Sequence, residues 1–275
     1  MSISKSKIVI LTTVSNRNLY SKSIQTHPIG IERIAIDGSK GLYGIDSLTF
    51  MFQKLKNTNF DWVIMADEDV FFINPEKIYN LIDYMNVNDY SICGVRDGGE
   101  INHRLHNPLA MNTFFLIINY GKLKTIWNKK EVLRTNKVDN KMEFDLKKLK
   151  YKYDINSHFE PYYCFFFWLS NKGLKLLYLG SKSPIDNDDL ISNLVYDNNE
   201  DELLIHSWYA RSYGVSEFHT NRIDNLIKLL NLFNLKGDYT VWNDVFFPIK
   251  LFFRKYNNKY LVKLVKRVSN KISKK

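Results

Sequence analysis

Short apolar runs recur along the first half of the chain and are separated by polar segments with turn residues. Residues 7–13, 31–37 and 60–66 are rich in β-branched or other apolar residues and alternate little, which is typical of strands buried on both faces. Residues 91–95 and 113–119 have a similar character. The pattern predicts a central sheet whose strands lie inside the domain.

Apolar residues at helical spacing fall between these runs. In residues 43–55 they recur every three or four positions, as Ile45, Leu48, Phe52 and Leu55. A second helix is expected to begin at Asn74-Pro75-Glu76, with asparagine as its cap and proline in its first turn. Its buried face would be Ile78, Leu81, Ile82 and Met85. Strands that alternate with helices predict the α/β class, with a mostly parallel Rossmann-type sheet and flanking helices.

The remaining segments suggest how the chain is divided. Residues 128–153 are charged and poorly periodic, so we expect a surface insertion or a loop there. Residues 223–235 have the pattern of a helix. We therefore predict a catalytic-sized domain in residues 1–221, followed by a helical region in residues 222–275.

The net charge of +10 is confined to the C-terminal end of the sequence. Residues 249–275 hold ten of the 39 Lys and Arg residues and none of the 29 Asp and Glu residues, so residues 1–248 are neutral overall. A nucleic-acid-binding protein is expected to spread cations and aromatic residues over a folded face. The neutral body therefore argues against a nucleic-acid partner.

The basic tail also has a regular apolar pattern. Apolar residues occur at every fourth position: Phe252, Tyr256, Tyr260, Leu264, Val268 and Ile272. A basic amphipathic helix of this kind can lie in the interface of an anionic membrane. The alternative is a helix that packs on its own domain with a solvated basic face. We expect residues 249–275 to bind membranes and to contribute little to the chemistry.

Two features concern the cellular location. Cys93 and Cys164 both lie within apolar stretches, where cysteine acts as a small buried apolar residue. The longest apolar run, residues 162–169, is far shorter than the roughly 20 residues of a membrane span. Together with the polar and basic N-terminal segment, these features predict a cytoplasmic protein, peripheral on the inner face of the cell membrane.

Three consecutive carboxylates, Asp67, Glu68 and Asp69, interrupt an apolar run that ends a predicted strand. Adjacent buried carboxylates are costly unless a cation compensates them. In extended chain Asp67 and Asp69 would project to one side and Glu68 to the other. Two oxygen ligands on one side suit Mg²⁺ or Mn²⁺. The alternative is a solvated loop that is merely acidic.

With this Asp-x-Asp, the chain resembles the GT-A glycosyltransferases, whose motif at the end of a central strand binds a divalent metal and the donor diphosphate. Three further stretches add to the resemblance: Thr12-Thr13 with Asp37-Gly38-Ser39, the strand at 112–119, and the late His206 segment at 205–211. The likeness covers residues 7 to about 214. It implies a nucleotide-sugar donor, most simply a UDP-sugar. A glycan or glycolipid acceptor, lipid-linked or on the cell surface, is expected from the location that the basic tail would give the protein.

The resemblance also assigns roles to individual residues. Asp67, Asp69 and His206 would hold the metal, with Asp67 contacting either the metal or the ribose. Asp37 would contact the base or ribose, and Thr12, Thr13 and Arg211 would complete the donor site. His206 and Arg211 could instead be structural or surface residues.

The catalytic base of such an enzyme stays open at this point. Glu160 lies beside an aromatic run and could be desolvated enough to act as a base. Asp188 and Asp189 form a second candidate pair with Asp186, at an expected helix start where carboxylates commonly cap. A phosphatase with a nucleophilic Asp is the rival enzyme class, but its motif normally follows the first strand and has Thr or Val where Phe71 stands here.

Overall fold

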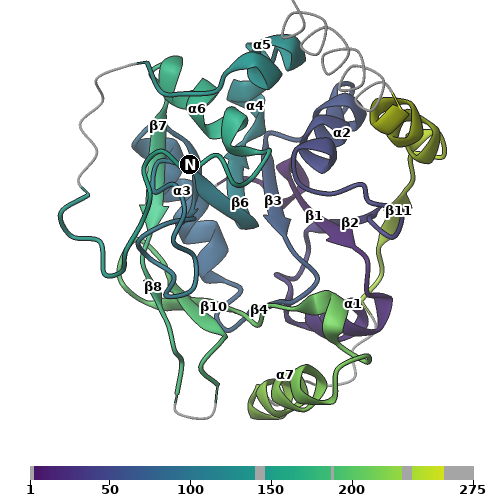
Figure 1. Ribbon diagram of the computed structural model, residues 1–275, viewed down its shortest axis with the longest axis vertical. Helices are drawn as coiled ribbons and strands as arrows, with labels where there is room; N and C mark the ends of the chain where they lie inside the picture. Colours follow the sequence, from purple (N-terminus) through teal and green to yellow (C-terminus); the bar gives the residue numbers. More distant parts are fainter. Residues whose placement is uncertain (1–2, 140–145, 187–188, 231–236, 257–275) are drawn as a thin grey trace, which may run out of the picture.

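The computed structural model describes residues 3–139, 146–186, 189–230 and 237–256 (Figure 1). The strands are β1 (Ile8–Val14), β2 (Glu32–Asp37), β3 (Trp62–Ala66), β4 (Val70–Phe72), β5 (Tyr90–Arg96), β6 (Met111–Asn119), β7 (Lys175–Leu179), β8 (Ser181–Lys182), β9 (Asn193–Tyr196), β10 (Glu202–His206) and β11 (Thr240–Trp242). The α-helices are α1 (Arg17–Ser23), α2 (Ile45–Leu55), α3 (Lys77–Val87), α4 (Tyr120–Leu123), α5 (Lys129–Arg134), α6 (Tyr163–Asn171) and α7 (Glu217–Leu229).

Seven strands form the central sheet in the order β11-β2-β1-β3-β6-β5-β7. All neighbours run parallel except at β6, which is antiparallel to both β3 and β5. The predicted mixed α/β architecture with a mostly parallel sheet is therefore confirmed. Because β6 is reversed, its first residues lie at the same edge of the sheet as the carboxyl ends of β1 and β3.

A second sheet of four strands, β4-β10-β9-β8, packs near this edge. Its strands are antiparallel throughout. β4 follows β3 after a three-residue turn, so the two sheets are joined directly at the acidic segment. Figure 1 shows β10 and β4 beneath the ends of the central strands.

The two faces of the central sheet are buried under different helices because side chains alternate along each strand. On β1, Val9 and Leu11 belong to a core that includes α2 and α6. Ile8 and Ile10 point to the other core, which includes α3 and the second sheet. Continuous apolar strands were the expected sign of this double burial, and the burial pattern of β1 and β3 agrees with it.

Several element boundaries differ from those expected. Asn74 is not the cap of α3, which starts at Lys77; its side chain donates instead to the carbonyl of Glu202. The charged region at 128–153 contains α5, which Asn128 caps through bonds from two backbone N–H groups. The apolar run at 162–169 forms most of α6, a helix buried on nearly every side.

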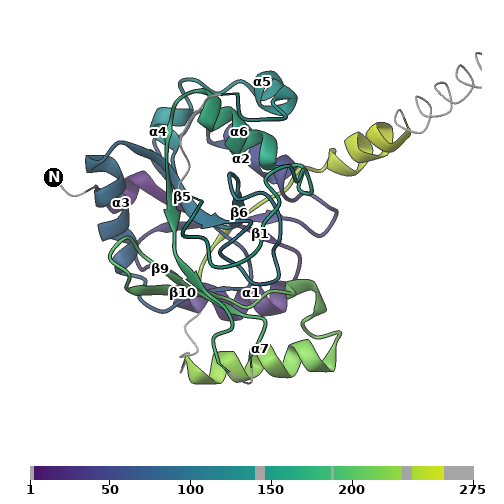
Figure 2. The same cartoon turned by 60° about the vertical axis from the view of Figure 1, so that its left-hand side comes forward.

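The C-terminal region is not only helical. α7 runs through the expected boundary at residue 222, and β11 then joins the edge of the central sheet beside β2. Residues 247–256 are helical, and this helix begins against the body near α2 and extends away from it (Figure 2). The rest of the basic tail, residues 257–275, lies outside the described part of the chain. In the described part, no helix combines the length and apolarity needed to span a membrane.

A buried histidine gives the fold a testable pH dependence. His27 is 2% exposed, and neither ring nitrogen has a hydrogen-bond partner among the described residues. Burial lowers the pKa of His27 to about 3. Between pH 6.5 and 3 the unfolded chain binds a proton that the folded protein does not, so the stability present above pH 6.5 is lost as the pH falls.

His27→Phe should therefore flatten the acid side of the stability profile. The wild-type free energy of unfolding should fall by up to about 1.4 kcal/mol per pH unit through this residue between pH 6.5 and 3. Urea unfolding from pH 8 to pH 4 would measure the slope. An identical slope in a folded variant would contradict the assignment.

Candidate functional site

The acidic segment forms a tight turn between the two sheets. Asp67, Glu68 and Asp69 connect the end of β3 to the start of β4. The backbone N–H of Asp67 donates to Phe114 on β6 at 2.8 Å, and that of Val70 donates to the Asp67 carbonyl at 3.1 Å. The segment is thus a turn and not the extended chain expected from the sequence, although Asp67 and Asp69 still converge.

Antiparallel pairing brings His206 to this turn from far along the sequence. His206 ends β10 and lies opposite Val70 on β4. The next backbone N–H, of Ser207, donates to the Asp69 carbonyl at 3.0 Å. As a result, His206 Nε2 lies 3.2 Å from Asp69 Oδ1, with both side chains about 95% buried.

Asp67, Asp69 and His206 form a group that could hold a metal ion. One ligand atom from each residue lies within 4.8 Å of the other two. Burial, together with the charges of Asp69 and Glu68, raises the pKa of Asp67 well above its usual range. His206 Nδ1 is buried and has no hydrogen-bond partner among the described residues. The two carboxylate oxygens suit Mn²⁺ or Mg²⁺, and the imidazole favours Mn²⁺ as the transition metal of the two. A bound cation would offset the repulsion between the carboxylates.

Aromatic side chains fix the position of the His206 ring. Phe114 on β6 stacks on the imidazole with ring centroids 4.1 Å apart and planes at 13°. Trp208 lies on it at 4.1 Å and 46°. The Trp208 indole N–H donates in turn to the Asn193 side chain at 2.7 Å. The ring therefore cannot rotate away from Asp69 without disturbing this packing.

Glu68 has a structural role that differs from that of its two neighbours. Its carboxylate accepts hydrogen bonds from the backbone N–H groups of Ser15 and Asn16, the latter at 3.0 Å. Burial raises the pKa of Glu68 to about 7 despite these bonds. The side chain thus ties the loop after β1 to the acidic turn, and the sequence pattern contained no signal for this contact.

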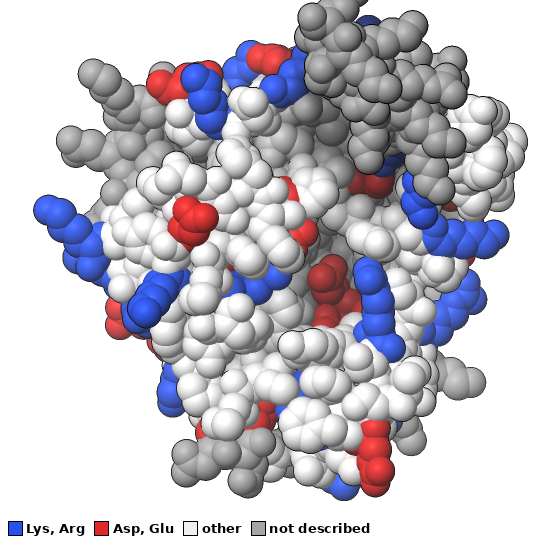
Figure 3. Space-filling model, in the orientation of Figure 1, with Lys and Arg blue, Asp and Glu red and all other residues white. Residues whose placement is uncertain are grey.

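These residues lie in a cavity of about 690 Å³, within the range that accommodates small-molecule ligands. Figure 3 shows acidic side chains within a hollow of the surface and basic side chains beside it. The residues that line the cavity include Thr13, Ser15, Tyr43, Asp46, Ser47, Asp67, Glu68, Asp69, Asn112, Glu160, Tyr162, His206, Trp208, Arg211, Leu251, Arg254 and Lys255. The strand ends that meet here come from β1, β3, β6 and β10.

The expected donor-binding residues divide into two groups. Thr13 lines the cavity and bonds the Ser47 hydroxyl at 2.7 Å, whereas Thr12 is fully buried one residue earlier on β1. Arg211 also lines the cavity, with its guanidinium 4.5 Å from the centre of the Tyr43 ring. Asp37, at the end of β2, lies outside the lining and accepts a hydrogen bond from the Ser39 N–H at 3.0 Å.

Glu160 reaches the cavity from the loop before α6. Its carboxylate pairs with Arg104 at 2.9 Å, and Arg104 also forms a two-point contact with buried Asp97 at 2.7 and 2.8 Å. Asp97 further accepts hydrogen bonds from Asn112, at 2.6 Å, and from Tyr163. This network holds the Glu160 carboxylate in the cavity lining.

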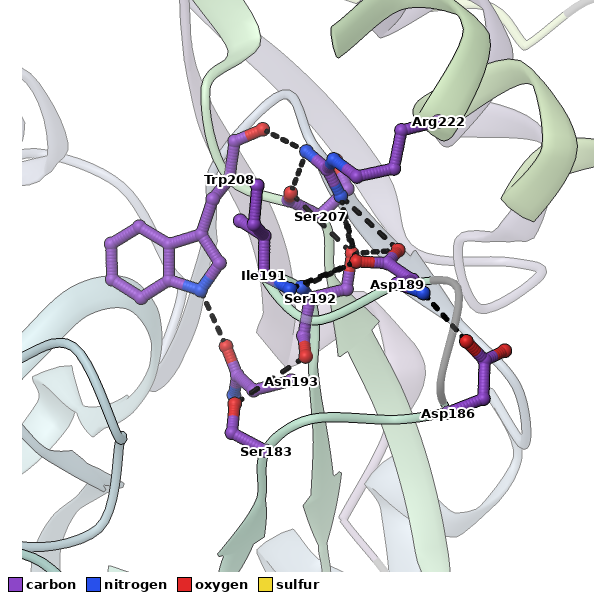
Figure 4. Close-up of polar contacts among 9 residues, drawn as sticks. All are labelled: Ser183, Asp186, Asp189, Ile191, Ser192, Asn193, Ser207, Trp208 and Arg222. Carbon is purple, nitrogen blue, oxygen red and sulfur yellow. Dashed lines mark hydrogen bonds and ion pairs between the residues drawn. The ribbon is translucent and has the colours of Figure 1, made fainter. Parts of the chain in front are cut away.

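The second pair of candidate bases is placed differently. Asp188 lies outside the described residues, and Asp189 does not begin a helix: it precedes β9 and accepts N–H groups from Ile191 and Ser192. Its carboxylate pairs with Arg222 of α7 at 3.1 Å (Figure 4). Asp189 therefore lies behind the His206 segment and not in the cavity lining.

Arg222 connects this ion pair to the segment that follows His206. Its guanidinium donates to the carbonyls of Ser207 at 2.5 Å and of Trp208 at 3.2 Å. Trp208 and Tyr209 both have left-handed backbone conformations, with φ of 60° and 61°. Non-glycine residues in that region cost roughly 1–3 kcal/mol each and persist only where surrounding contacts hold them. Arg222 supplies such contacts, and the turn directs Trp208 and Arg211 towards the cavity.

Replacing His206 tests the metal group directly. His206→Ala should weaken Mn²⁺ binding by about one order of magnitude or more, because a ligand is lost from the site. His103→Ala is the matched control, since that ring packs against Trp208 at 4.6 Å but is not part of the group. Mn²⁺ titration followed by electron paramagnetic resonance would measure both. Equal affinity of the two variants would leave His206 with a purely structural role.

Comparisons with known proteins give only distant likenesses. No protein-family model and no curated protein sequence matches the chain. Among solved structures it is similar to the mannosyltransferase PcManGT from Pyrobaculum calidifontis in complex with GDP-Man and Mn²⁺. The two sequences are 7% identical, the match covers 43% of this chain and 46% of that one, and the TM-score is 0.28. A glycosyltransferase involved in glycosylation of the major capsid of PBCV-1 matches at 12% identity, with coverages of 43% and 63% and a TM-score of 0.30.

The glycosyltransferase GlyE of Streptococcus pneumoniae TIGR4 also matches at 12% identity, with coverages of 82% and 64% and a TM-score of 0.31. The chain thus spans less than two thirds of each of these proteins. All three are glycosyltransferases, but likenesses with such low TM-scores carry no argument about function. The chemistry of this chain has to be inferred from its own site.

Proposed function

We propose that this chain is a metal-dependent glycosyltransferase of the hexosyltransferase type. It would move a sugar from a nucleoside diphosphate donor, most simply a UDP-sugar, to a hydroxyl group of a lipid-linked or cell-surface glycan. The observation that carries the proposal is the convergence of Asp67, Asp69 and His206 at the edge of a mostly parallel sheet, in a cavity that also contains Arg211. Ligands of α/β sheets bind outside the carboxyl ends of the strands.

Each part of the cavity has a role in this reaction. Asp67, Asp69 and His206 would hold Mn²⁺ or Mg²⁺, which when bound takes up negative charge on the leaving diphosphate. Arg211 adds a cation near the same place, and Tyr43 beneath its guanidinium restricts where that cation can lie. Thr13 is held by Ser47 at the end of β1, where its side chain can contact the donor.

Glu160 is the candidate base that the cavity geometry favours. Of the described candidates, Glu160 lines the cavity and Asp189 does not. The Arg104 guanidinium holds the Glu160 carboxylate in place, and Arg104 is itself anchored to buried Asp97. We assign Glu160 the removal of the proton from the acceptor hydroxyl, which corresponds to inversion at the sugar carbon.

The membrane partner is proposed from the C-terminal segment. The helix at 247–256 has one side with exposed apolar residues, namely Ile249, Phe252, Phe253 and Tyr256, each 54% to 64% exposed. Seven further cations and no acidic residue follow in residues 257–275. Exposed apolar residues next to a cationic segment suit the interface of an anionic membrane. We propose that the protein acts as a cytoplasmic, peripheral membrane enzyme on the inner face of the cell membrane.

The metal assignment is tested with Asp69→Ala. This variant should lose nucleotide-sugar turnover and Mn²⁺-dependent thermal stabilisation by UDP or GDP, because the metal loses a ligand. Asp61→Ala is the matched control: Asp61 lies just before β3, is 45% exposed and pairs with Lys7 and Lys124. Full turnover by folded Asp69→Ala protein, or by the wild type in EDTA, would refute the metal-dependent mechanism.

Glu160→Gln separates catalysis from donor binding. The variant keeps the shape of the side chain but cannot accept the hydroxyl proton, so transfer should fall by a factor of about 10² to 10⁴. Donor affinity should change little, because the metal ligands are untouched. Asp61→Asn, at a half-exposed residue outside the cavity lining, serves as the comparison in steady-state assays. Equal loss in both variants, or none in Glu160→Gln, would contradict the assignment.

The membrane proposal is tested by neutralising the seven cations of residues 257–275 to Gln in the full-length chain. Each cation near an anionic surface contributes about 1 kcal/mol, so co-sedimentation with anionic liposomes should drop sharply. Hydrolysis of the soluble nucleotide sugar should persist. High salt should weaken wild-type binding only in part, because apolar insertion is not screened. Unchanged liposome binding would place the anchor elsewhere.

A further inference from the structure

The helix at 247–256 has two distinct sides. Phe247 is 4% exposed and belongs to the core beneath α2, and Leu251 packs against the same core one turn later. Phe252 and Tyr256, on another side, are exposed. The helix at the start of the basic tail is therefore packed on the folded body through Phe247 and Leu251.

The inward side continues into the cavity. Leu251, Arg254 and Lys255 all line it, together with the metal group and Arg211. The positions 247, 251 and 254 are separated by four and three residues, which places them on one helix face. The same packing that buries Phe247 thus carries two cations to the cavity wall.

Arg254 is fixed there by a two-point ion pair. Its two terminal nitrogens lie 2.9 and 3.0 Å from the carboxylate oxygens of Asp46 in the first turn of α2. This pair raises the pKa of Arg254. A guanidinium has five N–H donors in a planar fork, so three stay free for another anion after two bind Asp46. The next residue, Ser47, bonds Thr13 inside the cavity.

The cavity consequently holds both signs of charge. The carboxylates come from the turn between β3 and β4, whereas Arg211, Arg254 and Lys255 come from later segments. A divalent cation with a diphosphate has the complementary arrangement: the metal meets the carboxylates, and the remaining phosphate charge meets the cations.

We propose that Arg254 and Lys255 bind the diphosphate of the donor, so that the first part of the basic tail belongs to the donor site. This inference rests on the proposed function and extends it to residues outside the sequence resemblance. It differs from the expectation that residues 249–275 contribute little to the chemistry, and the experiment below decides between the two. The inward side of the helix at 247–256 would then serve the cavity, and its outer apolar side, with the seven cations of 257–275, would serve the membrane.

The test measures equilibrium binding of UDP and of inorganic pyrophosphate, each with Mn²⁺, by titration calorimetry on the full chain. Arg254→Ala and Lys255→Ala should each weaken binding of both probes about tenfold, the effect of losing one charge-assisted hydrogen bond. Lys250→Ala is the matched control, because Lys250 lies on the same helix, is 56% exposed and pairs with Asp244 at 2.8 Å. It should bind both probes as the wild type does. Arg254→Lys keeps the charge and should recover part of the loss, which excludes unfolding as the cause.

The outcomes separate this inference from the proposed function. If the wild type binds Mn²⁺ with UDP but Arg254→Ala and Lys255→Ala bind as tightly as Lys250→Ala, the inference is wrong and the function stands. If these two variants lose affinity for anionic liposomes and not for pyrophosphate, the cations serve the membrane and the inference is again wrong. If the wild type binds neither UDP, GDP nor pyrophosphate with Mn²⁺, both proposals fail.

Discussion

Three adjacent carboxylates in one buried turn are the constraint on which the rest of the site depends. Burial raises the pKa values of Asp67 and Glu68, and like charges this close add to the effect. The chain deals with each carboxylate separately. Glu68 accepts two backbone N–H groups from the loop after β1, and Asp69 meets His206 from β10. Asp67 has cationic Arg211 as its compensating neighbour. Each of these contacts also fixes a segment that lines the cavity.

The backbone that follows His206 is also constrained, because it has to place two further side chains at the cavity. Two consecutive left-handed residues, Trp208 and Tyr209, turn the chain sharply so that an aromatic ring and Arg211 both reach the cavity. Such a turn is unfavourable by itself. Arg222, buried against Asp189, donates to the carbonyls of Ser207 and Trp208 at the start of the bend. A buried ion pair is weak evidence of stability in general, but here it holds a strained functional segment in one conformation.

The sequence revealed the parts of the molecule that local pattern determines. Buried strands such as β1 and β3 have apolar runs because both faces of the sheet are covered, and the acidic turn is visible because it breaks such a run. The meeting of His206 with Asp69 required a family resemblance, since β4 and β10 are more than 130 residues apart. Asp189 looked like a cap or a base because its partner, Arg222, is on a distant helix. The reversed direction of β6 likewise depends on the sheet order and leaves no mark in the strand itself.

The C-terminal helix is a second case in which the local sequence pattern does not reveal contacts with distant segments. Its net charge and the four-residue spacing of its apolar residues are typical of a membrane-binding helix. They give no sign that Phe247 and Leu251 face the body. Spacing gives one apolar face, but this helix has apolar residues on two sides, one packed on the core and one exposed. Because Arg254 and Lys255 follow the packed side, any shift of the helix on α2 would also move the cations that line the cavity. The shape of the candidate donor site therefore depends on how this helix packs on the body. A membrane that binds the outer side of the helix would also affect the positions of Arg254 and Lys255 in the donor site, because both sides belong to the same helix.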